Sequence, residues 1–113
     1  MNLNTYLYLI QEAESYRTIT FPRYEQPDIK KRLKAGKEVQ TVRCSAHYKR
    51  FKLNQICKTQ WGELIKIIKV TNIQNHEDLP NFNLMDDKMK SDIKKYCKPG
   101  KIEDIRFVKY KET

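Results

Sequence analysis

Residues 35–52 read AGKEVQTVRCSAHYKRFK, and the rest of the chain is interpreted outward from them. Gly36 can take the left-handed conformation that ends a helix. The alternation that follows predicts a strand over residues 38–44, with Thr41 and Arg43 on the same face. Neither face of this strand is wholly apolar, which indicates a strand that borders a cleft.

The net charge of the chain is concentrated around this stretch. Residues 30–58 contain ten Lys or Arg and one acid, whereas the other residues hold 13 basic and 13 acidic side chains. Basic groups that neutralise phosphates release counterions, so this segment predicts RNA or single-stranded nucleic acid as a partner. The alternative is a solvated basic face that keeps the protein soluble. The expected nucleic-acid contacts are Lys30, Lys31, Lys34, Lys37, Arg43, Lys49, Arg50 and Lys52.

Two aromatic residues near the basic side chains are candidates for stacking on an unpaired base. Tyr48 lies in the basic loop that follows the strand, and Trp61 precedes Gly62 in a predicted turn. For Trp61 the alternative is packing at that turn.

Hydrophobic periodicity and turn residues predict the remaining elements. Helices are expected over residues 1–16, 27–35 and 85–96, and further strands over 18–21, 55–59, 63–70 and 102–110. In the second helix Ile29 and Leu33 are expected to face the core, and in the third Met85, Met89, Ile93 and Tyr96 are spaced for one face. In the last strand Ile105 and Phe107 are expected to face inward. Because no linker divides the chain, residues 1–113 are expected to form one α+β domain, a small curved or barrel-like mixed sheet of about five strands with peripheral helices. The N-terminal helix could bury Tyr6, Leu7 and Ile10 against a second subunit, which makes a homodimer an open alternative.

The three cysteines, Cys44, Cys57 and Cys97, form no C-x-x-C pair, which favours reduced thiols over a disulfide framework. Cys44 and His47 could begin a zinc site with Cys57, Cys97 or His76, but a second close ligand pair is missing, so no metal or other cofactor is expected. The chain has no run of about 18 apolar residues and no basic signal region. A cytoplasmic, intracellular protein without a membrane partner is therefore expected.

An ordered set of short motifs runs through the chain. They are Thr20-Phe21, Ala35-Gly36-Lys37, Thr41-Val42-Arg43, Trp61-Gly62, Glu77-Asp78-Leu79-Pro80 and Pro99-Gly100. This set resembles an ASCH domain of the PUA-like superfamily, over about residues 18–110. The resemblance implies a PUA-like β-barrel with a cleft beside the Thr41–Arg43 strand, and a role in binding RNA or modified nucleosides.

Some bacterial members of that family are amidohydrolases that act on N4-acetylcytidine, with a pattern similar to A-G-x-K-T-x-T-x-R. Their catalytic groups are the lysine, the second threonine and a later glutamate. This chain keeps Thr41 and Arg43, but Glu38 stands at the lysine position and Glu77 is the nearest acid before the glutamate region. Lys37 shares the strand face of Thr41 and could replace the lysine. The resemblance thus implies Thr41, Lys37 and either Glu38 or Glu77 as catalytic candidates of an alternative hydrolase, which is this amidohydrolase or a ribonuclease.

Overall fold

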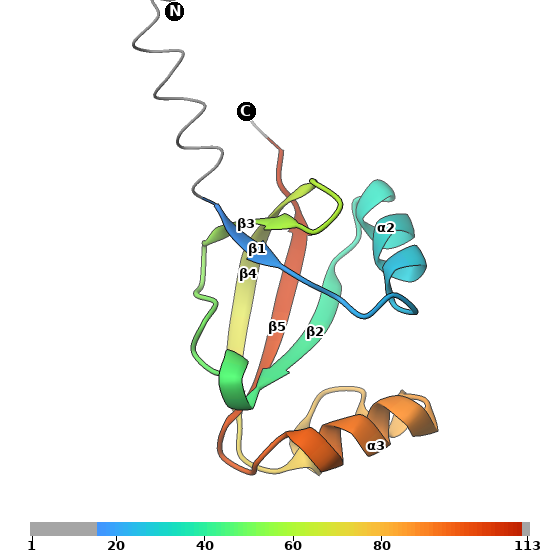
Figure 1. Ribbon diagram of the computed structural model, residues 1–113, viewed down its shortest axis with the longest axis vertical. Helices are drawn as coiled ribbons and strands as arrows, with labels where there is room; N and C mark the ends of the chain where they lie inside the picture. Colours follow the sequence, from blue (N-terminus) through green and yellow to red (C-terminus); the bar gives the residue numbers. More distant parts are fainter. Residues whose placement is uncertain (1–15, 112–113) are drawn as a thin grey trace, which may run out of the picture.

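The computed structural model describes residues 16–111, except for the side chain of Ala46. It shows an α+β fold in which a five-stranded mixed sheet has the order β1-β3-β4-β5-β2 (Figure 1). Strand β1 pairs with β3 in parallel, and the other pairs are antiparallel. The elements are β1 (Arg17–Ile19), α2 (Gln26–Lys34), β2 (Val39–Cys44), β3 (Ile56–Thr59), β4 (Leu64–Ile73), α3 (Asp87–Tyr96) and β5 (Ile102–Lys109).

The sheet is not closed, so the prediction of a barrel is wrong. Its edge strands β1 and β2 do not pair with each other in the described part of the chain. Strand β1 is only three residues long, and Pro22, which has no N–H to donate, lies close behind it. A side chain bridges the edges instead: Arg43 Nη2 on β2 donates to the carbonyl oxygen of Thr20, just after β1, over 2.7 Å.

The main core lies between α2 and the sheet. Ile29 and Leu33 of α2 are buried there, as are Ile105 and Phe107 of β5, which confirms their predicted inward positions. Helix α2 ends as expected, because Gly36 adopts a φ of 70°. The other buried members of this core are Ile19, Phe21, Val39, Phe51, Cys57, Ile65 and Ile67.

A second core forms under α3, which lies beneath the end of the sheet where β2 finishes (Figure 1). The Asp86 side chain caps this helix by accepting from the Met89 backbone N–H over 2.7 Å. Ile93 faces inward as predicted, but Tyr96 is 61% exposed, so its expected place on the buried face is wrong. Cys97, four residues after Ile93, lies on the buried face instead. Its disulfide bond to Cys44 of β2 leaves the Tyr96 side chain exposed to solvent.

Strand β5 carries two buried acids that the predicted pattern did not include. Asp104 is 1% exposed and accepts from Gln40 Nε2 and from Arg106 Nε, over 2.7 and 3.0 Å. Glu103 is 5% exposed and accepts from the backbone N–H of Lys49 over 2.6 Å. Both acids are buried, and their hydrogen bonds compensate for desolvation.

The helix predicted over residues 1–16, and the dimer contact proposed for it, lie outside the described residues apart from Tyr16. Within residues 16–111, no helix is long and apolar enough to cross a bilayer.

Candidate functional site

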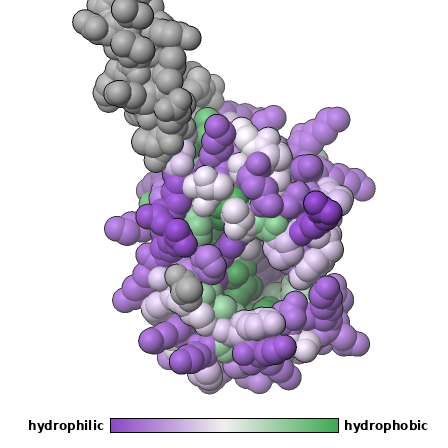
Figure 2. Space-filling view, in the orientation of Figure 1, coloured by the Kyte–Doolittle hydropathy of each residue, from purple (hydrophilic) through white to green (hydrophobic). Residues whose placement is uncertain are grey.

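A cleft of about 920 Å³ opens between α2, β2 and α3. Figure 2 shows it as a hollow in this face of the molecule, with apolar residues on its floor. Thr41 and Arg43 line it from β2, and Glu38 lines it from the residue before that strand. The expected cleft beside residues 41–43 is therefore present, although the sheet remains open.

Arg43 is held by the fold from several sides. Besides its hydrogen bond to Thr20, its guanidinium carbon lies 5.1 Å from the ring centroid of Phe21 and 5.6 Å from that of Phe51. Burial lowers the pKa of Arg43, and the nearby Glu25 carboxylate opposes this. Its Nε atom is buried without a hydrogen-bond partner among the described residues. Arg43 thus supports the cleft wall and joins the sheet edges, and only part of its guanidinium remains available to a ligand.

Glu25 is one of the cleft residues that the sequence did not single out. It is the residue before α2, and its side chain makes no capping hydrogen bond, which leaves its carboxyl group to the cleft. Burial raises the pKa of Glu25, while Arg43 and the Tyr24 hydroxyl lower it. An acid two residues before Pro27 is typical of a helix start, so its sequence position gave no signal for a site.

The cleft is lined by more carboxylates than cations, in a chain whose net charge is +9. Five carboxylates face it against three arginines. The carboxylates are Glu25, Asp28, Glu38, Asp86 and Asp92, and the arginines are Arg32, Arg43 and Arg106. The formal charge of this lining is therefore opposite in sign to the net charge of the chain.

Most of the predicted nucleic-acid contacts lie outside the cleft, in two separate places. Four belong to or follow α2, and we call Lys30, Lys31, Lys34 and Lys37 the helix surface. Three lie in the loop before β3, and we call Lys49, Arg50 and Lys52 the loop surface. Figure 1 shows α2 beside β2 and this loop beyond β4, with the sheet between them. The structure therefore does not bring the basic residues together on a single face.

The two stacking candidates, Trp61 and Tyr48, differ in how much of the ring is available to a base. Trp61 packs against Phe21 with ring centroids 5.9 Å apart, and its other neighbours are Lys30, over the ring at 5.1 Å, and Glu63, which accepts from its Nε1. This ring is therefore engaged in packing. Tyr48 is half-buried, and its hydroxyl accepts from Asn72 Nδ2. Tyr48 lies next to the loop surface and leaves part of its ring to solvent.

The catalytic candidates are not assembled around one point. Thr41 and Glu38 line the cleft, but Lys37 lies outside it and lines a separate recess of about 210 Å³ beside α2. Glu38 Oε1 lies 3.7 Å from Arg106 Nη1, so its charge is partly compensated within the fold.

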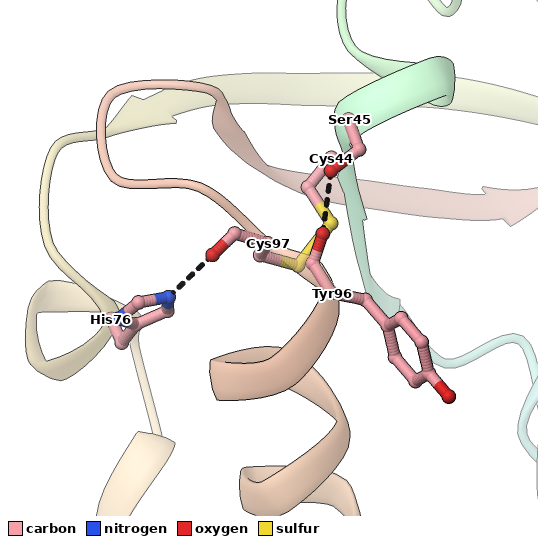
Figure 3. The surroundings of a disulfide bond; sticks show 5 residues. All are labelled: Cys44, Ser45, His76, Tyr96 and Cys97. Carbon is pink, nitrogen blue, oxygen red and sulfur yellow. Dashed lines mark hydrogen bonds between the residues drawn. A yellow bond between two sulfur atoms is a disulfide. The ribbon is translucent and has the colours of Figure 1, made fainter.

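A disulfide joins Cys44, at the end of β2, to Cys97, just after α3 (Figure 3). The expectation of reduced thiols is wrong for these two residues, and so neither is a free zinc ligand. Ser45 Oγ donates to the carbonyl oxygen of Tyr96, and His76 Nε2 donates to that of Cys97 over 2.8 Å. These three links fix the end of α3, and thereby the cleft wall that Cys97 and Tyr96 help to form. The disulfide also removes the cysteine argument for a reducing compartment.

Counting thiols tests this pairing. Cys57 is fully buried, and burial raises its pKa to about 11, so it is expected to resist alkylation at neutral pH. The native protein should show no rapidly reacting thiol, the unfolded unreduced protein one, and the unfolded reduced protein three. Three reactive thiols in unfolded protein that was never reduced would contradict the disulfide.

Comparison with known proteins gives no match to a family model, to a curated protein or to a solved structure.

Proposed function

We propose that this protein is a non-enzymatic module that binds single-stranded RNA through its helix surface and loop surface. The observation that carries the proposal is the exposure of the charge. Nine of the ten Lys and Arg residues between 30 and 58 are exposed, and Arg43 is the exception. Within the described residues, Arg32 alone among them forms a salt bridge, with Asp28. The other exposed cations form no salt bridge within residues 16–111, so their charge can neutralise phosphates.

The separation of the two surfaces favours a single strand over a duplex. A flexible strand can follow cations that lie on different sides of a small domain, whereas a stiff duplex contacts one side. The carboxylates of the cleft would keep the phosphates outside it. Tyr48 supports the same choice, because an aromatic ring beside Lys49 can stack on an unpaired base, which contributes about 1–3 kcal/mol.

The fold is compatible with an opened form of the PUA-like class, and we include this in the proposal. The ordered motifs support it, as does the curvature that lets Arg43 reach Thr20 across the sheet edges. The alternative hydrolase has weaker support, because Lys37 lies outside the cleft that Thr41 lines. Intact recovery of RNA and of an acylated nucleoside after incubation would separate the binding module from this enzyme.

Replacing the loop surface in the triple variant Lys49→Ala/Arg50→Ala/Lys52→Ala should weaken binding of labelled single-stranded RNA about tenfold. It should also reduce the slope of log affinity against log salt by about 2, since each lost phosphate contact removes about 0.7. Fluorescence anisotropy over a series of salt concentrations measures both quantities.

The matched control removes three lysines from α3 in Lys88→Ala/Lys94→Ala/Lys95→Ala. It lowers the net charge by the same amount at a place that the proposal does not use. Equal losses in the two variants would show a general charge effect and would count against the loop surface.

A further inference from the structure

The cleft has more carboxylates than arginines in its lining, although the net charge of the chain is +9. Two of its arginines are paired within the fold, since Arg32 Nε lies 3.0 Å from Asp28 Oδ2 and Arg106 Nε lies 3.0 Å from Asp104 Oδ2. Arg43 donates to a backbone carbonyl. By contrast, three of the carboxylates have no salt bridge among the described residues. These are Glu25, which lies near Arg43, Asp86, which caps α3, and Asp92.

Apolar side chains are exposed around the same carboxylates. Of the five exposed large hydrophobic residues in the described chain, three line this cleft. Leu84 is 84% exposed, Tyr96 61% and Tyr24 48%. Exposed apolar side chains that gather around a hollow are typical of an interaction site, because removing apolar surface from water is favourable. Met85 and Met89 add flexible side chains that can adapt to a partner.

The tyrosine rings at this cleft already contact ammonium groups of the chain itself. Lys88 Nζ lies 4.6 Å from the ring centroid of Tyr24, and Lys95 Nζ lies 5.2 Å from that of Tyr96. Each ring therefore already has an ammonium group of the chain over it. A partner that carries cations would meet the carboxylates of the cleft, and its apolar side chains would meet the exposed parts of the rings.

We propose that the cleft is a docking site for a basic, amphipathic segment of a partner protein. Lysine or arginine side chains of that segment would meet Glu25, Asp86 and Asp92, and its apolar side chains would cover Leu84 and Tyr96. Charge complementarity selects this occupant, because an acidic or nucleic-acid ligand is repelled by the cleft. The exposed apolar residues distinguish it from a small polyamine, which would leave them uncovered. This site is separate from the helix and loop surfaces proposed for RNA.

The test is binding of a fluorescent peptide of alternating lysine and leucine to the full chain, followed by anisotropy. A chain of net charge +9 repels this peptide generally, so attraction requires a local acidic site. The double variant Glu25→Gln/Asp92→Asn should weaken binding about fivefold or more, through the lost ion pairs. The double variant Glu77→Gln/Asp87→Asn removes two carboxylates that do not line the cleft and should leave binding unchanged.

Two further variants test the apolar half of the proposal. Leu84→Ser changes a side chain that is almost wholly exposed, so the fold should be unaffected while peptide affinity falls. A peptide with serine in place of leucine should bind more weakly than the original. Absence of binding, equal losses in the two carboxylate variants, or equal affinity for the serine peptide or for spermidine would overturn the proposal. Peptide binding should survive the loop-surface variant, so its outcome does not depend on RNA binding.

Discussion

Replacing Cys44 and Cys97 by serine should lower the free energy of unfolding by about 4 kcal/mol. The disulfide joins residues with a sequence separation of 53, and the loop-closure relation for a loop of that size gives this magnitude at 25 °C. The loss of stability should be local as well as global. Because Cys97 attaches α3 to the end of β2, hydrogen exchange should speed up first in α3, which forms one wall of the cleft.

Denaturant unfolding of the wild type and the double variant, each with and without a reductant, measures this effect. The reductant should destabilise the wild type by about the same amount as the substitutions and should leave the variant unchanged. A wild type whose midpoint does not respond to reductant would show that the bond contributes nothing to stability.

Replacing Phe107 by alanine should cost about 3–5 kcal/mol, the usual range for a buried phenylalanine. Phe107 is fully buried in β5, where it pairs with Val39 on one side and Ile67 on the other. Its ring centroid lies 5.5 Å from that of Phe21, in the segment that leads from β1 to α2. Removing the ring therefore loosens the contact between the sheet and this segment.

The control for Phe107 is its neighbour Val108, which is only half-buried and pairs with Lys66. Val108→Ala should cost clearly less in the same denaturant titration. A domain of this size typically has a free energy of unfolding of about 5–15 kcal/mol, so Phe107→Ala should remove a large part of it. Similar losses in both variants would contradict the placement of Phe107 at the centre of the core.

The elements that local pattern predicts well are those whose signals lie close together in sequence. The pair Ile29 and Leu33, with Gly36 after them, fixes α2 and its end, and alternation fixes the inward side of β5 at Ile105 and Phe107. These signals depend on helix and strand geometry alone.

Features that depend on long-range assembly could not be predicted in this way. The α-carbon atoms of Cys44 and Cys97 come within 5.3 Å only because α3 packs against the end of β2. Closure of a barrel depends on strand length and register, and the short β1 prevents it here. The carboxylates of the cleft come from segments as distant as Glu25 and Asp92, so the sequence shows scattered acids where the fold gathers them.

The measurement that tests the central proposal most directly is binding of labelled single-stranded RNA to the full chain at about 50 and 200 mM salt, with duplex DNA and duplex RNA in parallel. The proposal predicts tight binding of the single strand at low salt, a steep loss at higher salt, weaker binding of both duplexes, and recovery of intact RNA. Absence of binding at low salt would contradict it and leave the basic segment as a solvated surface, and cleaved RNA would transfer support to the hydrolase.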